Sequence, residues 1–305
     1  MLLHRVAYPV VGFKYSSKIQ ASFGFSPMLR LTSLGAKMPS LKITASVTQE
    51  ECAAVQREFS TRGQWTLDRE TYNSPNGKST LVLDCKNEIA FGPMVFAASV
   101  KTADKKSVKL SSKSGTNSFL SPGRYGQGYD HWDGDPWSPD SSQIAIFDFL
   151  QRGSGGIGGG SLFSVSSGKW TRFADGPGVF SHHMWSPSGE HYLFRDLKSW
   201  YILNATTGQS RHLAAVNRYP CHAYFLSADH VLLIEDSFRI MSVETLELLT
   251  EESHPDVELG TDRYSLYDPK GNRVLLGVGT SIGEVVTCRK WYAIEVIEMD
   301  GPGQP

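Results

Sequence analysis

The sequence is poor in cysteine and has no long apolar run. Its four cysteines are widely spaced and include no Cys-x-x-Cys pair: Cys52, Cys85, Cys221 and Cys288. Such scattered cysteines argue against both a disulfide framework and a zinc knuckle. No stretch approaches the roughly 18 consecutive apolar residues that a membrane-spanning helix requires. We therefore expect reduced thiols, no membrane association and a cytoplasmic location.

The chain also lacks a strong charge of either sign, because 30 basic and 31 acidic residues leave a net charge of −1. This balance gives no reason to expect a nucleic-acid partner. Acidic residues are absent from 1–49, although basic ones are present there. A basic, acid-free leader resembles a transit peptide. If residues 1–37 are a real targeting segment, the protein would be sent to an organelle or exported. Alternatively, the protein begins at Met28 or Met38, and the leader is an over-extended start of the sequence. Either way, we expect a leader over 1–39 and a folded domain over 40–305.

The sequence does contain one short motif in four copies, and each copy begins with an aromatic residue. The copies are Trp137-Ser138-Pro139-Asp140, Trp185-Ser186-Pro187-Ser188-Gly189, Phe225-Leu226-Ser227-Ala228-Asp229 and Tyr267-Asp268-Pro269-Lys270-Gly271. An apolar triplet follows each copy of the motif, and the four copies with their triplets align without gaps. The triplets are Ile144-Ala145-Ile146, Tyr192-Leu193-Phe194, Leu232-Leu233-Ile234 and Val274-Leu275-Leu276. The leading aromatics are 48, 40 and 42 residues apart. A period near 40 with this content predicts a β-propeller, in which each repeat forms one blade.

Two further positions recur with the same period. Eleven residues after the aromatic stand Asp148, Asp196 and Asp236. Three equivalent copies favour a structural role, in which each carboxylate accepts hydrogen bonds from backbone amides at a strand end. The leading aromatics themselves are expected to pack between neighbouring sheets.

The ends of the chain predict how the propeller is completed. Strand Trp291–Met299 is the last in the sequence, so the final blade lacks an outer strand, and the alternating segment Ser40–Val47 is the natural donor. The capping box at Thr48 and Glu51 predicts a short helix over 49–59. Upstream, Val82–Asn87 resembles a degenerate fifth repeat, and Trp65–Asp84 could supply a sixth blade. The prediction is an all-β fold: one propeller of five or six four-stranded blades with a short N-terminal helix.

These repeats resemble the WD-repeat-like β-propeller repeats of the TolB type, most clearly between residues 130 and 300. The resemblance implies the architecture. It leaves the activity open, because such propellers serve as protein-binding scaffolds, as domains beside peptidases and occasionally as enzymes.

Two glycine patterns imitate catalytic or cofactor motifs. Gly153–Gly158 satisfies G-x-G-x-x-G, but the residues after it alternate like a strand, whereas a dinucleotide site needs a helix there. Gly279–Gly283 satisfies G-x-S-x-G, but no histidine follows His254, as the order of a hydrolase triad would require. Both are interpreted as hairpin loops, and no nucleotide is expected.

The candidate site lies in the segments that precede each copy of the motif. In a propeller these segments form the innermost strands. Counting back from the aromatics, His182 and His222 stand at the same offset, and we expect them at equivalent heights in adjacent blades. The neighbouring candidates are His183, Asp133, Asp135 and Arg263. Imidazoles and carboxylates converging from different blades could act as an acid–base pair or hold a divalent metal, with His182, His222 and Asp135 as ligands. Alternatively, these residues are polar because the channel is wet.

A second candidate is the segment Tyr125–Asp133, whose Tyr129 and Trp132 could form an aromatic rim that holds a sugar, a peptide or a protein. It could equally be a packed loop. The lysine-rich stretch Lys101–Lys106 is interpreted as a solvated hairpin tip, since no aromatic residues interleave with it.

Taken together, the patterns favour a non-catalytic scaffold that binds a protein or peptide through its rim and channel mouth, with no cofactor. The alternative is a propeller enzyme, a hydrolase or lyase acting on carbohydrate or peptide through channel His and Asp residues, with or without a divalent metal.

Overall fold

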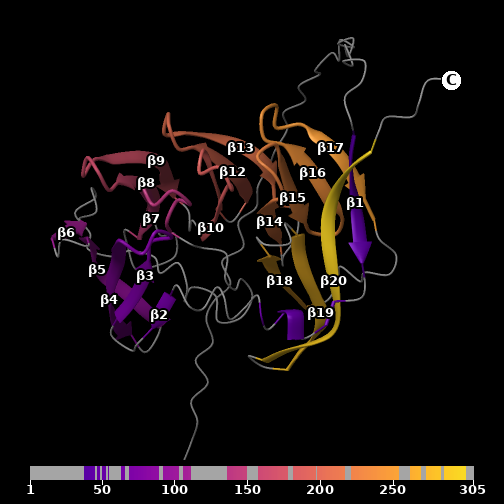
Figure 1. The fold of residues 1–305 in the computed structure, drawn as a ribbon, viewed down its shortest axis with the longest axis horizontal. Coiled ribbons are helices and arrows are strands. Elements are labelled where there is room, and N and C mark those ends of the chain that lie inside the picture. The colour runs from indigo at the N-terminus through magenta and orange to yellow at the C-terminus, as the bar shows by residue number, and fades with distance from the viewer. Residues whose placement is uncertain are drawn as a thin grey trace, which may run out of the picture. The chain divides into compact units, whose positions relative to one another are not determined.

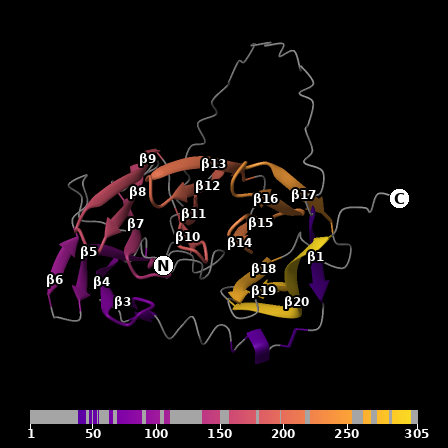
Figure 2. The ribbon, with the colours of Figure 1, turned by 45° about the horizontal axis from the view of Figure 1, so that its top comes forward.

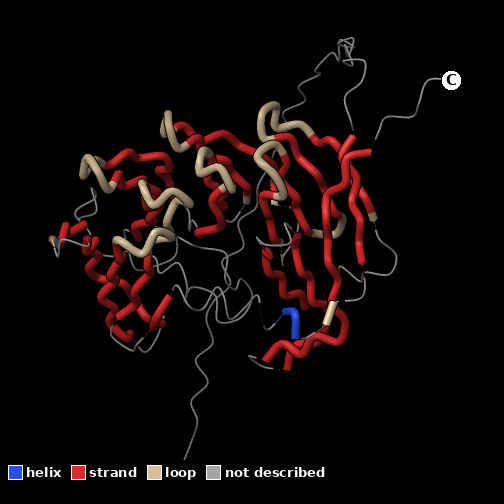
Figure 3. Tube along the Cα trace, in the orientation of Figure 1, coloured by secondary structure: helices blue, strands red, loops and turns tan. Residues whose placement is uncertain are grey.

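The computed structural model describes residues 38–44, 47–48, 50–52, 54, 63–65, 69–88, 92–102, 106–110, 136–149, 157–177, 181–196, 198–216, 221–253, 262–268, 273–282 and 285–299. Nearly all of these residues lie in strands or in the turns between them (Figure 3). Residues 50–52 and 54 are helical, and the rest of the predicted 49–59 helix lies outside the described residues. In the described part of the chain, no helix has the length and apolar character needed to cross a membrane.

The described strands form five antiparallel sheets, numbered here in chain order (Figure 1). Sheet 1 contains β2 (Gly63–Trp65), β3 (Arg69–Asn73), β4 (Ser79–Glu88), β5 (Gly92–Thr102) and β6 (Ser107–Leu110). Sheet 2 contains β7 (Gln143–Phe149), β8 (Ile157–Ser164) and β9 (Trp170–Pro177). Sheet 3 contains β10 (Ser181–Trp185), β11 (His191–Arg195), β12 (Ser199–Asn204) and β13 (Gln209–Ala215).

Sheet 4 contains β14 (His222–Phe225), β15 (His230–Ile234), β16 (Phe238–Ser242) and β17 (Leu248–Glu252). Sheet 5 contains β18 (Asp262–Asp268), β19 (Arg273–Ile282), β20 (Val285–Met299) and β1 (Met38–Thr44). Within each sheet, strands that are neighbours in sequence pair with one another, apart from β1. The fold is therefore nearly all-β and propeller-like, as the repeats predict.

Strand β1 confirms the predicted donor. It pairs antiparallel with β20 from Met38 opposite Met299 to Thr44 opposite Ala293, and Figure 2 shows the two strands side by side. Leu41 is buried in the cluster between sheets 4 and 5. The Leu41 amide and the Ser40 hydroxyl both donate to Oε1 of Glu252 in β17, each at 3.2 Å. The donor strand is thus bonded to its own sheet and to the outer strand of the sheet before it.

Apolar clusters join each sheet to the next in chain order. A strand exposes alternate side chains on opposite faces, so one triplet can contribute to two interfaces. In sheet 2, Ile144 and Ile146 pack toward sheet 1, whereas Ala145 and Phe147 pack toward sheet 3. Further clusters join sheets 3 and 4 and sheets 4 and 5.

The leading tryptophans connect adjacent sheets, as predicted. Trp137 is 1% exposed and its Nε1 donates to the carbonyl of Tyr72 in sheet 1 at 2.9 Å. Trp185 makes the equivalent bond, at 3.2 Å, to the carbonyl of Pro136. Each tryptophan therefore combines ring burial with a hydrogen bond to the backbone before the turn of the preceding repeat.

Sheet 1 carries a copy of the repeat that the aromatic pattern does not reveal. Its turn is Ser74-Pro75-Asn76-Gly77, in which the Ser74 hydroxyl accepts the amide of Ser79 at 2.9 Å, as the Ser138 hydroxyl accepts that of Gln143. The fourth turn position has a positive φ in each copy, 68° at Gly77 and 65° at Ser141. The leading position is Asn73 rather than an aromatic residue, which is why the pattern is hidden.

This turn changes the predicted organisation of the N-terminal part. The segments Trp65–Asp84 and Val82–Asn87, predicted for two blades, lie in one sheet of five strands. In sheet 1, β3 corresponds to β10 of sheet 3 and to β14 of sheet 4, which are the first strands of their sheets. The additional strand, β2, pairs with the edge of β3 that lies away from β4.

The third repeat is shifted by one residue relative to the ungapped alignment. Its turn is shorter, because the Leu226 amide bonds to the His230 carbonyl, whereas the Ser186 amide bonds to that of His191. Phe225 therefore lies opposite Val231, as Trp185 lies opposite Tyr192. The predicted triplet is wrong for this copy. The structural equivalent is Val231-Leu232-Leu233, and Glu235 rather than Asp236 takes the place of Asp196.

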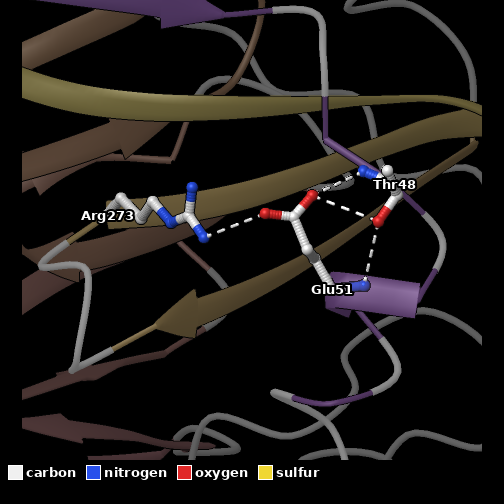
Figure 4. Close-up of polar contacts among 3 residues, drawn as sticks. All are labelled: Thr48, Glu51 and Arg273. Atoms are coloured by element: carbon white, nitrogen blue, oxygen red, sulfur yellow. Dashed lines mark hydrogen bonds and ion pairs between the residues drawn. The ribbon is translucent and has the colours of Figure 1, made fainter.

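The helical residues cover the face of sheet 5 that points away from sheet 4. Cys52 packs there against Leu275 and Ala293. The predicted capping box forms, with Thr48 N donating to Glu51 Oε2 at 2.8 Å and Glu51 N donating to Thr48 Oγ1 at 3.2 Å. Glu51 Oε1 also lies 3.6 Å from a guanidinium nitrogen of Arg273 in β19 (Figure 4). The described residues 48, 50–52 and 54 are called the cap below.

Candidate functional site

The candidate residues that the structure describes lie at one end of sheets 3 to 5. The proximal end of a sheet is defined here as the end at which its first strand, β10, β14 or β18, starts. His182 is near the start of β10, His222 starts β14 and Arg263 is near the start of β18. The hairpins that connect β11 to β12 and β15 to β16 lie at the same end, because Ser181 pairs with Arg195 and His222 pairs with Ile234.

The register does not place the two histidines at equivalent positions. His182 lies opposite Phe194, whereas His222 lies opposite Ile234, one position further along its partner strand. The difference arises because β10 carries a β-bulge at His183, between His182 and Met184, that β14 lacks. A bulge adds one residue to its strand and shifts everything beyond it. An ungapped count along the sequence cannot detect such an insertion.

His222 is the candidate whose side chain is described, and it is part of the protein interior. It is 3% exposed, and its ring is stacked on that of Tyr224 with centroids 6.5 Å apart and an interplanar angle of 16°. Tyr224 in turn packs in the cluster between sheets 4 and 5. The imidazole of His222 is therefore held by packing.

The proximal end also contains charged residues that were not singled out from the sequence. Glu235 is 2% exposed and forms an ion pair with Arg239 at 2.7 Å across the hairpin between β15 and β16. Arg195 is buried, and its guanidinium carbon lies 5.7 Å from the centroid of the Trp200 ring. Glu235 directly follows the apolar run Val231–Ile234 and precedes Asp236, and this position at the end of the run is the sequence signal that could have identified it.

Asp196 occupies in sheet 3 the position that Glu235 occupies in sheet 4. Its Oδ1 accepts the amides of Lys198 and Ser199, both at 2.7 Å, as predicted for this repeated carboxylate. Its Oδ2 accepts the Tyr201 hydroxyl at 3.1 Å. Burial, and next the Asp196 carboxylate, raise the pKa of Tyr201 above its ordinary value. Both carboxylates thus close a hairpin at the proximal end.

The remaining candidates are not tested by the structure. Tyr129, Trp132, Asp133 and Asp135 lie outside the described residues, and the side chains of His182, His183 and Arg263 are not described. Among the residues that are described, no group of three His, Cys, Asp or Glu side chains is arranged to hold a metal ion.

Comparisons with known proteins give similar folds and no family. No family model matches the chain, and no curated protein matches it. The similar solved structures include the β-propeller domain of the Trilobed protease from Pyrococcus furiosus, with 10% identity, 73% of this chain and 68% of that chain covered and a TM-score of 0.46.

In two other similar structures, a smaller share of the neighbour's own chain is covered. An oligogalacturonate lyase in complex with manganese has 11% identity over 71% of this chain and 59% of that one, with a TM-score of 0.42. TolB from Acinetobacter baumannii has 13% identity over 73% of this chain and 54% of that one, with a TM-score of 0.34. Likenesses at this level assign no activity to the chain.

Proposed function

We propose that the chain is a non-catalytic β-propeller scaffold that binds a protein or peptide through its rim and channel mouth. In this proposal each of the five sheets is one blade of a single propeller, and β1 completes the last blade. The stacking of successive sheets through apolar clusters supports the single array.

The burial of His222 carries the choice of scaffold over enzyme. A general acid or base must reach the proton that it transfers, and the imidazole of His222 is 3% exposed and stacked on Tyr224. The neighbouring carboxylates are similarly used to close hairpins. A proximal end stabilised in this way is suited to hold binding loops in fixed positions.

The test is reconstitution of a complex with the full chain. Affinity capture from native extract identifies a candidate partner, and size-exclusion chromatography with light scattering of the two purified proteins then gives the stoichiometry. Tyr129→Ala and Trp132→Ala should each weaken the complex while leaving the melting temperature unchanged. His222→Ala should lower the melting temperature and leave the affinity of the folded fraction unchanged.

The enzyme alternative makes the opposite prediction. A hydrolase or lyase that uses the channel residues would lose turnover on carbohydrate or peptide substrates in His182→Ala or Asp135→Ala, while its folding and partner binding remained intact. That result, or the absence of any complex of defined stoichiometry, would overturn the scaffold proposal.

A further inference from the structure

Strand β6 is the most exposed of the outer strands that the structure describes in full. Its first three residues, Ser107, Val108 and Lys109, are all exposed. The outer strands of sheets 3 and 4 are tied to neighbours, since Arg211 of β13 donates to the carbonyls of Glu244 and Val243, and Thr250 of β17 donates to that of Pro39. The order of sheet 1 ends at β6.

No described strand pairs with the outer edge of β6, called the open edge below, and two residues present hydrogen-bonding groups there. In an antiparallel pair, residues alternate between those whose N–H and C=O point to the partner strand and those whose groups point away. The Thr102 amide donates to the Lys106 carbonyl at 3.0 Å, and Val100 lies opposite Val108 in the same register. Lys106, Val108 and Leu110 therefore bond toward β5. Ser107 and Lys109 direct their backbone groups to the open edge.

The two faces of this edge differ in chemistry. Lys109 lies opposite Ser99, and Lys101 lies opposite Ser107, so these lysines share one face of the sheet. Val108 is 42% exposed on the other face. Neither Lys101 nor Lys109 forms an ion pair within the described part of the chain. A strand added to β6 would place acidic side chains beside the lysines and an apolar side chain beside Val108.

The lysines of sheet 1 also determine which strands cannot pair with β6. Like charges disfavour pairing of β6 with β6 of a second copy, which is how natural sheets avoid edge-to-edge association. The same charges favour an acidic strand, so attraction and repulsion select the same occupant.

We propose that β6 binds an extended acidic peptide, which adds to sheet 1 as a further strand. The peptide alternates acidic and apolar residues, its main chain bonds to Ser107 and Lys109, and its acidic side chains pair with Lys101 and Lys109. This inference rests on the proposed binding function and adds the chemistry of the partner.

The direct experiment measures fluorescence anisotropy of labelled synthetic peptides mixed with the full chain. A peptide that alternates Glu and Val should bind, and raising the salt from about 0.05 M to about 0.5 M should weaken it, because exposed charge pairs are screened. A peptide with Lys in place of Glu should not bind. A Glu–Val peptide that is N-methylated along its centre keeps the charge but cannot donate main-chain hydrogen bonds, and it should not bind either.

Variants of the protein locate the site. The double variant Lys101→Glu, Lys109→Glu should weaken the Glu–Val peptide about tenfold or more. The matched control Lys169→Glu reverses an exposed lysine in the turn between β8 and β9 and should bind like the wild type. Ser107→Pro removes one outward N–H without removing a bond to β5, so it should weaken the peptide at an unchanged melting temperature.

Each other outcome overturns the proposal in a recognisable way. Equal binding by the charge-reversed double variant places the peptide elsewhere, and absence of binding rejects an acidic strand. Self-association that is abolished by Ser107→Pro in sedimentation would make a second copy the occupant, because that variant removes an outward N–H of β6. If the reconstituted complex survives charge reversal, the scaffold function stands and the β6 assignment falls. If no complex forms but the peptide binds as described, β6 stands and the rim proposal falls.

Discussion

At the scale of single residues, Trp137 determines how sheets 1 and 2 meet. Its ring fills the interface that contains Leu81 and Ile144, and its Nε1 bonds to the Tyr72 carbonyl. The ring and the hydrogen bond can be separated, because phenylalanine retains most of the apolar surface and lacks the donor.

Trp137→Ala should lower the free energy of unfolding by about 3–5 kcal/mol, through lost burial and the cavity left behind. Trp137→Phe should cost less, about 1–3 kcal/mol, since the principal loss is a partner for a buried carbonyl. Urea denaturation measures both values. Equal costs for the two variants would contradict the role given to the Nε1 bond.

Glu235 and Asp236 test which residue is equivalent to Asp196. Glu235→Gln weakens a buried ion pair and leaves the guanidinium of Arg239, which is 14% exposed, without its carboxylate. We expect a loss of about 1–3 kcal/mol in the free energy of unfolding. Asp236 is exposed, and Asp236→Asn should lower the free energy of unfolding by less than Glu235→Gln does, because exposed charge interactions contribute little. Thermal denaturation measures the loss of stability in each variant. A larger loss for Asp236→Asn than for Glu235→Gln would favour Asp236 as the equivalent of Asp196, as in the ungapped alignment.

At the scale of elements, the cap shows how a short helical segment is held on a sheet. Thr48 and Glu51 satisfy each other's orphan amides, while Arg273 attaches the cap to β19. Hydrogen bonding from the Thr48 amide, then from its hydroxyl, and the charge of Arg273 lower the pKa of Glu51 below its ordinary 4.5.

The lowered pKa makes the cap sensitive to acid. A group whose pKa is lower in the folded state stabilises that state above its unfolded pKa, and this contribution is lost as the pH falls through the folded value. Wild-type protein and Glu51→Gln should therefore differ in melting temperature at neutral pH and converge below about pH 4.5. A difference that persisted unchanged into acid would show that the carboxylate is not responsible.

Cys52 belongs to the cap and reports on it at constant pH. It is 3% exposed, because it packs against Leu275 and Ala293 of sheet 5, so its alkylation requires the cap to detach from the sheet. Glu51→Gln should accelerate alkylation of Cys52, measured by peptide mass spectrometry. Cys221, which is buried between sheets 3 and 4, should react at an unchanged rate.

At the scale of the whole molecule, β1 links the two ends of the folded chain. The N-terminal strand lies in the sheet formed by the C-terminal strands, so loss of β1 should destabilise more than its own sheet. Leu41→Ala should lower the free energy of unfolding by about 2–4 kcal/mol. Its exposed neighbour offers a matched control, because Lys42→Ala removes only an exposed ion pair with Glu295 and should cost no more than about 1 kcal/mol.

The same two variants test cooperativity. Far-UV circular dichroism and tryptophan fluorescence should give coincident transitions in wild type and in Leu41→Ala, because the sheets are joined in series through shared clusters. Separate transitions in the variant would mean that sheet 5 unfolds independently.

What the sequence alone determined was the local chemistry of the repeats. The Ser-Pro turns, the apolar triplets, the burial of Trp137 and Trp185 and the donor strand all follow from short-range patterns, because turn residues and alternating side chains act over a few positions. Asp196 was identified for the same reason, since its hydrogen bonds lie within its own hairpin.

What only the tertiary structure decided was register between strands. A turn shortened by one residue moved the third triplet and exchanged Asp236 for Glu235, and a bulge at His183 separated His182 from His222. The exposure of His222 and of β6 likewise depends on which surfaces neighbouring sheets cover. Such properties arise from contacts between segments distant in sequence, and side chains on a strand reverse face with every residue of slip.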